Sequence, residues 1–191
     1  MYTTQHLRLR RMMLCALFTA LTAVCSQIAL PMPWGIPVNL ALFAVYLAGV
    51  RLGPVWGAVS QLVYLGLAAV GVPVMAELSG GPAALFGRTG GYAIGYLAAA
   101  LITGPLAARR QTFLRFCLAM AAGCAGCYAL GTVWFMAVSG IGLWQSLTLC
   151  VLPFLPGDAV KILLAAWVGV RLGRALPGRG GGNARWRGSE V

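Results

Sequence analysis

The stretch FLRFCLAMAAGCAGCYALGTVWFMAV, residues Phe113–Val138, is apolar along its whole length except for Arg115 near its start. A helix needs about 20 mostly apolar residues to cross the hydrocarbon core of a bilayer. This stretch is longer than that minimum and contains no acidic residue. It therefore predicts a membrane-spanning helix.

The rest of the chain has the same character. Of its 191 residues, 60% are hydrophobic and 9% are charged, and the mean hydropathy is +0.85. Soluble domains contain about 25% charged residues, and a small fold leaves too much surface wet to bury so many apolar side chains. The composition excludes a soluble globular domain. It predicts an all-α, polytopic protein of the cell (inner) membrane.

Six apolar runs are separated by turns and irregular stretches. A basic leader before an apolar run can be a cleaved signal peptide, but here the run is too long and no small-residue cleavage site ends it, so we expect the chain to retain it. The six predicted spans are Met12–Leu30, Val38–Val50, Val55–Val70, Gly91–Ala107, Phe113–Val138 and a run from about Gly157 to Arg174. We expect a leader at 1–11, a six-transmembrane-helix bundle at 12–174 and a disordered cationic tail at 175–191.

The charge pattern predicts the orientation of the bundle. The chain has 14 Lys and Arg residues against three acidic residues, a net charge of +11. Twelve of the cations fall on one side of the predicted membrane, which by the positive-inside rule is the cytoplasmic side, so both termini are expected inside. They are Arg8, Arg10, Arg11, Arg51, Arg109, Arg110, Arg115, Arg171, Arg174, Arg179, Arg185 and Arg187. We interpret this charge as a signal for topology and anionic lipids; no nucleic-acid-binding motif is present.

Apart from Glu190 in the tail, four charged residues are not explained by topology: Glu77, Arg88, Asp158 and Lys161. All four fall near the predicted outer end of the bundle. Ionisable side chains at membrane depth usually face the bundle interior and have a functional partner. Asp158 and Lys161 are three residues apart and therefore share a helix face. They form either a ligand site or a structural ion pair at the start of the last span, where Asp158 also suits the cap position.

The sequence Arg88-Thr89-Gly90-Gly91-Tyr92 precedes the fourth span. Glycines allow a ligand to approach the backbone, and the N-terminus of the following helix attracts anions. A flexible connection with close helix packing is the alternative. The positive-inside rule does not account for a cation such as Arg88 on the outer side. A carboxylate is the kind of group that its guanidinium would bind.

Three further features bear on a site. Trp144 is the aromatic residue that we expect to line a ligand cavity, because it lies in the loop before Asp158, and Asn39 is a polar residue at a span edge. Cys124 and Cys127 form a CxxC pattern, which inside an apolar run indicates small packing residues. We expect no metal site and no cofactor.

Two motifs resemble signatures of the BioY family, the biotin-specific S (substrate-binding) subunits of energy-coupling factor (ECF) transporters. LFGRTGGYAIGY (Leu85–Tyr96) is similar to the family's loop before span 4, and LPFLPGDAVKILLAA (Leu152–Ala166) to its stretch entering span 6. The opening ALFTALTAVCSQIALPMPWGIPVNLALFAVYLAG also follows the family's first two spans. The resemblance covers about residues 12–174.

The resemblance implies a six-helix bundle that holds biotin in a cavity at its outer end. Asp158 would accept the ureido N–H groups, and Lys161 or Arg88 would pair with the carboxylate. Gly90, Gly91 and Tyr92 would close over the ligand. The implied partners are a transmembrane coupling protein and ABC-type ATPases, with Ala16 and Ala20 forming the small-residue face that meets the coupling protein.

The chain also departs from the family pattern. Arg88 stands where the family usually has Pro, Ala41 where Gln is frequent, and Asn39 where Thr is usual. No Walker motif is present, so the chain itself does not hydrolyse ATP. The alternatives are an S subunit for thiamin or riboflavin, an intramembrane enzyme using Asp158, and a ligand-free assembly subunit.

Overall fold

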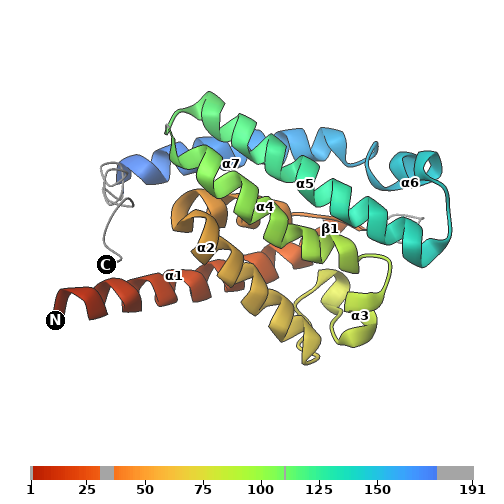
Figure 1. Ribbon diagram of the computed structural model, residues 1–191, viewed down its shortest axis with the longest axis horizontal. Coiled ribbons are helices and arrows are strands. Elements are labelled where there is room, and N and C mark those ends of the chain that lie inside the picture. Colours follow the sequence, from red (N-terminus) through yellow and green to blue (C-terminus); the bar gives the residue numbers. More distant parts are fainter. Residues whose placement is uncertain (1, 31–36, 110, 176–191) are drawn as a thin grey trace, which may run out of the picture.

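A computed structural model describes residues 2–30, 37–109 and 111–175, which form a mostly helical bundle (Figure 1). Arg110 and, except for residue 175, the predicted tail at 175–191 lie outside the described residues. In order, the helices are α1 (Tyr2–Gln27), α2 (Ala41–Ala69), the 3-10 helix η1 (Ala76–Leu78), α3 (Pro82–Phe86), α4 (Gly90–Ala108), α5 (Phe113–Ser139), α6 (Leu143–Cys150) and α7 (Leu155–Ala175). Two short antiparallel strands, β1 (Ala29–Leu30) and β2 (Val38–Asn39), pair between α1 and α2.

Four of the described helices are long and apolar enough to cross a membrane: α1 over Arg8–Gln27, α2, α4 and α5. A fifth crossing results if α6 and α7, which are bent by 53° at their junction, form one broken span. The membrane-protein class is therefore confirmed. The helix α1 starts at Tyr2, so most of the predicted leader belongs to the same helix as the first span.

The second and third predicted spans lie within α2, which is interrupted at Gly53. This residue has φ 80° and ψ −179°, a conformation that only glycine adopts without strain. A Cβ atom placed on Gly57 would lie 3.1 Å from the Cα of Gly49, so the backbone after Gly53 folds back on the backbone before it. The turn predicted at Arg51–Pro54 thus exists as a sharp reversal inside α2.

Small residues bring the central helices into close contact. Ribbons of α4 and α5 run side by side in Figure 1, and Gly95 of α4 leaves room for Cys127 of α5. Gly104 of α4 packs on Pro54 of α2, where a Cβ would lie 2.7 Å from the Pro54 Cα. Lipid offers no hydrophobic drive for helix association, so such close backbone approach is a main source of stability in a membrane bundle.

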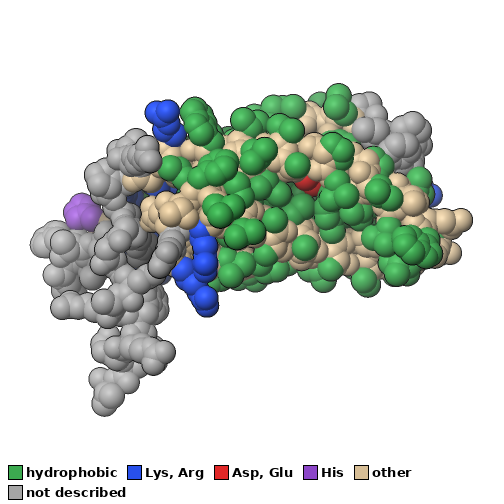
Figure 2. Space-filling view, turned by 90° about the horizontal axis from the view of Figure 1, so that it is seen from above, with side chains coloured by type: hydrophobic (Ala, Val, Ile, Leu, Met, Phe, Trp, Pro, Cys, Tyr) green, Lys and Arg blue, Asp and Glu red, His purple; other side chains and the backbone are tan. Residues whose placement is uncertain are grey.

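The two ends of the bundle differ in charge. In Figure 1, α1 begins and α7 ends at the same end of the molecule. Figure 2 shows Lys and Arg side chains gathered near that end, whereas hydrophobic side chains cover the middle. The described part of the chain thus has the surface of a protein embedded in lipid, with a basic rim at one end.

The contact of α4 with α2 gives a first prediction. Gly104→Ala would place a methyl group against the backbone of Pro54, and we expect a loss of about 1–3 kcal/mol in stability, because a well-packed interior resists added volume. The melting temperature of the protein in detergent should fall by several degrees. Gly66→Ala is the matched control, since no atom lies within 4 Å of a Cβ there; equal melting temperatures for the two variants would contradict the prediction.

Candidate ligand-binding cavity

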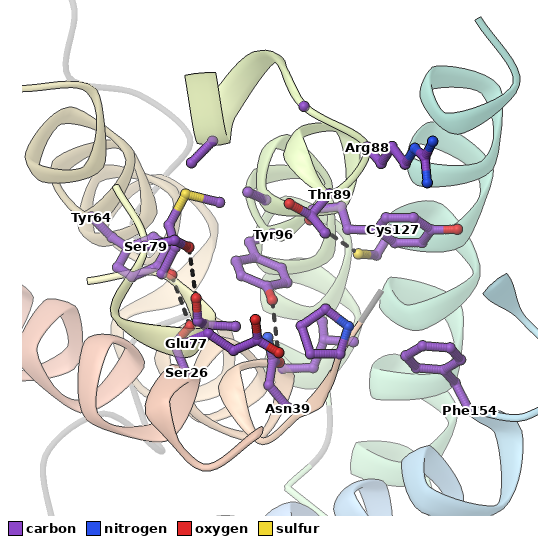
Figure 3. A pocket seen from close by; sticks show the side chains of 18 of the residues that line it. Ser26, Asn39, Tyr64, Glu77, Ser79, Arg88, Thr89, Tyr96, Cys127 and Phe154 are labelled. Carbon is purple, nitrogen blue, oxygen red and sulfur yellow. Dashed lines mark hydrogen bonds between the residues drawn. The ribbon is translucent and has the colours of Figure 1, made fainter. Parts of the chain in front are cut away.

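A cavity of about 360 Å³ lies among α1, α2, α4, α5, α7 and the segment around η1 (Figure 3). Its size falls within the range of small-molecule sites. Tyrosines and apolar residues line it together with a few charged groups. The lining residues are Ser26, Pro37, Asn39, Leu42, Tyr64, Met75, Ala76, Glu77, Ser79, Ala84, Gly87, Arg88, Thr89, Tyr92, Ala93, Tyr96, Cys127, Tyr128, Phe154, Asp158 and Lys161.

Asp158 and Lys161 form the buried charged part of the cavity. They lie three residues apart near the start of α7, and the Lys161 Nζ donates to the Asp158 Oδ1 over 2.7 Å. The two residues are 3% and 7% exposed. The structure thus confirms that they share a face, and it brings both into the cavity. This is the only ion pair found among the described residues.

Tyr128 of α5 completes the site, and sequence reasoning missed it. Its hydroxyl donates a short hydrogen bond to the Asp158 Oδ2, and the Cys124 thiol lies 3.7 Å from the same oxygen. Both carboxylate oxygens therefore already have donors. Helical spacing places Cys124 and Tyr128 one turn apart on one face of α5, but it does not show which residue of another helix they meet.

Arg88 lies at the exposed side of the cavity. Its side chain is exposed, and no acidic partner is found for it among the described residues. Thr89, the next residue, also lines the cavity. In Figure 3 the Arg88 guanidinium extends away from Tyr96 and Asn39. The cavity therefore has a buried end at Asp158 and a solvent-accessible cation at its mouth.

The glycines of the predicted loop have a packing role. Gly90 and Gly91 are buried and do not line the cavity. A Cβ on Gly91 would overlap Trp134 of α5, and one on Gly90 would overlap the Leu85 carbonyl. Trp134 Nε1 also donates to the Gly87 carbonyl over 3.0 Å. In this structure the two glycines let α4 start tightly beneath its loop and beside α5. That they cover a bound ligand stays a prediction.

Tyr92 and Asn39, two residues of the predicted site, line the cavity. The Asn39 Oδ1 accepts hydrogen bonds from the Ala41 amide at 3.2 Å and from the Tyr96 hydroxyl at 3.4 Å. Asn39 thus joins the start of α2 to a cavity tyrosine. The Cys127 thiol donates to the Tyr92 carbonyl over 3.5 Å (Figure 3). Cys127 is therefore a packing residue that also contributes to the cavity wall.

Trp144 does not belong to the cavity. Its side chain is 80% exposed on α6, and it is absent from the cavity lining. The prediction for Trp144 is wrong, because α6 turns this face outward and buries Ser146 and Cys150 instead.

Ala16 and Ala20 lie one turn apart on an exposed face of α1, together with the exposed side chains of Met13 and Leu17. By contrast, Ser26, the residue of the same helix that lines the cavity, is 1% exposed. Among the described residues, no group of three His, Cys, Asp or Glu side chains could hold a metal ion.

Comparison with known proteins identifies the family. The sequence model of the BioY family matches residues 2–178. The chain belongs to the BioY family. Biotin transporter BioY of Thermotoga maritima is 32% identical over 164 residues, which cover 86% of this chain and 96% of that protein. Biotin transporter BioY of Rhodobacter capsulatus is 34% identical over 185 residues, covering 88% and 95%.

A solved structure agrees with this assignment. The crystal structure of the S-component for biotin from an ECF-type ABC transporter is 27% identical and superposes with a TM-score of 0.81, covering 88% of this chain and 93% of that one. This BioY protein is therefore a multi-pass membrane protein with the S-component fold.

The ion pair of this BioY protein gives a second prediction. Lys161→Met leaves the Asp158 carboxylate without its charged partner, and we expect a loss of roughly 3 kcal/mol in the free energy of unfolding. The double variant Asp158→Asn/Lys161→Met removes both charges and should recover most of that loss. Denaturation in detergent of the unmodified protein, the two single variants Asp158→Asn and Lys161→Met, and the double variant gives a double-mutant cycle. Additive effects would show that the two side chains do not stabilise each other.

Proposed function

We propose that this BioY protein binds biotin in the cavity and is the biotin-specific S subunit of an ECF transporter, a transport protein and not an enzyme. The observation that carries the proposal is the buried Asp158–Lys161 pair at the end of a small-molecule cavity. The names of the relatives and of the similar solved structure support biotin as the ligand.

The chemistry of biotin fits the two ends of the cavity. Its ureido ring offers two N–H donors and one carbonyl acceptor, and Asp158 can accept the former while Lys161 and Tyr128 donate to the latter. Its fused ring is apolar enough to lie against Tyr92, Tyr96 and Phe154, all of which line the cavity. Its carboxylate reaches the mouth, where Arg88 and Thr89 lie, so the charged tail stays near water.

The chain crosses the membrane six times, with both termini inside. The reversal at Gly53 supports this count, because it divides α2 into two segments, residues 41–52 and 54–69, that correspond to the second and third predicted spans. The other passes are α1, α4, α5 and α7. The cations at the end where α1 begins and α7 ends support the orientation. The cavity then opens outward, and biotin is captured from outside.

The sequence contains no Walker motif, so any ATP hydrolysis that drives transport comes from partner subunits. We assign the exposed Ala16 and Ala20 face of α1 to the transmembrane coupling protein, which in turn carries the ABC-type ATPases. Anionic lipid headgroups contact the basic end. The loop Val72–Thr89 acts as the gate of the cavity.

Equilibrium binding of labelled biotin to the purified protein in detergent gives a third prediction. Asp158→Asn and Lys161→Ala should each weaken binding by about ten- to a hundred-fold, because each removes a hydrogen bond to a charged group. Val160→Ala is the matched control: Val160 lies between them on α7 but is 56% exposed on the lipid side. Equal affinities for all four proteins would refute the site.

Unlabelled thiamin and riboflavin added to the same assay test the alternative vitamins. Displacement of labelled biotin by biotin alone supports the proposal. Displacement by thiamin or riboflavin at lower concentration would assign the cavity to that vitamin.

The partner face gives a fourth prediction. Ala16→Trp and Ala20→Trp should reduce co-purification of the coupling protein by about ten-fold, which corresponds to about 1.4 kcal/mol, because a bulky ring prevents close helix approach. Biotin binding should remain unchanged in both variants. Ala121→Trp, on an exposed face of α5, is the control. Loss of the coupling protein with Ala121→Trp alone would move the interface to α5.

A further inference from the structure

One wall of the cavity is a short segment that packs on the bundle from outside its helices. We call residues 72–81, which contain η1, the lid segment. Met75, Ala76, Glu77 and Ser79 of this segment line the cavity. Val74 and Met75 are buried, whereas Glu77, Leu78 and Ser79 are exposed. The lid segment therefore separates the cavity from solvent on this side.

The backbone of the lid segment is a tight closed loop. Met75 and Ser79 form an isolated antiparallel bridge, and a Cβ on Gly80 would overlap the Val72 carbonyl. Between them, Glu77 and Leu78 have φ values of 59° and 54°, in the left-handed region that side chains with a Cβ disfavour. Two successive residues in this region need support from outside the loop.

Gln27, the last residue of α1, supplies that support. Its Nε2 donates to the Met75 carbonyl at 2.9 Å and is 3.5 Å from the Pro73 carbonyl, while its Oε1 accepts from the Leu78 amide at 3.0 Å. One amide side chain thus binds the loop just before its two strained residues and at the second of them, Leu78. Among the described residues, the other helix side chain that bonds to the lid segment is Tyr64 of α2, whose hydroxyl donates to the Val74 carbonyl at 3.2 Å.

We propose that Gln27 is a positioning residue that fastens the lid segment over the cavity and thereby sets the rate at which the ligand escapes. The ligand part of this inference rests on the proposed function. Gln27 touches the lid backbone and does not line the cavity, so it acts on the ligand through the lid. The same helix exposes Ala16 and Ala20, so a displacement of α1 by a partner would act directly on the lid fastening.

The test compares Gln27→Met with Gln145→Met. Methionine keeps the length of the side chain and removes both the donor and the acceptor. Gln145 is exposed on α6, outside the cavity, and is the matched control. Gln27→Glu keeps an acceptor for the Leu78 amide but places a carboxylate against the Met75 carbonyl, so it should behave like Gln27→Met.

Hydrogen exchange of the ligand-free protein is the first readout. The amides of Met75, Ser79 and Gly81 donate to backbone carbonyls and not to Gln27. If Gln27 fastens the lid, all three should exchange about ten-fold faster in Gln27→Met, the effect expected from losing one to two net hydrogen bonds. Faster exchange of Leu78 alone, or equally faster exchange throughout α5, would overturn the proposal.

Biotin dissociation is the second readout. The dissociation rate of Gln27→Met should rise about ten-fold with little change in the association rate, and Gln145→Met should match the unmodified protein. An unchanged dissociation rate despite a loosened lid would overturn the link to the ligand. Failure of the unmodified protein to bind biotin would refute the proposed function instead, and the exchange measurement would still decide the role of Gln27.

Discussion

The buried carboxylate of Asp158 is the constraint on which this bundle depends. A charge at membrane depth is tolerated only when it is paired and hydrogen-bonded. Lys161 supplies the opposite charge from the same helix, whereas Tyr128 and Cys124 approach from α5. The polar contacts therefore tie α7 to α5, and they fix the buried end of the cavity even when no ligand is present.

Such a polar interior requires a rigid frame around it. The frame comes from small residues, because Gly95, Gly104 and Gly123 let α4 approach α5 and α2 at backbone distance. A reversal at Gly53 folds α2 onto itself and provides two packing surfaces from one element. Tight packing on these faces holds the tyrosines of the cavity wall in place. The close helix packing around the cavity therefore keeps its walls in place.

The sequence predicted those features that depend on local spacing or on composition. The i, i+3 spacing of Asp158 and Lys161 predicted their shared face, and the apolar runs predicted the membrane class. Features that depend on how helices meet were missed or wrong. Nothing local indicates that α6 turns Trp144 outward, that Gly91 leaves room for Trp134, or that Tyr128 reaches Asp158 from another helix. The number and orientation of the spans stay predictions.

The hydrogen bonds that the Asp158 carboxylate already accepts limit how a ligand can bind there. Because both carboxylate oxygens already accept hydrogen bonds, a ligand gains only the difference between its own bonds and those that it displaces. A ligand with donors alone would leave the Lys161 ammonium or the Tyr128 hydroxyl without an acceptor. A group that carries N–H donors beside a carbonyl acceptor can donate to the Asp158 carboxylate and accept from Lys161 or Tyr128 at the same time. The ureido ring has that combination, so the proposed biotin site at Asp158 would favour cyclic ureas and amides over simple cations.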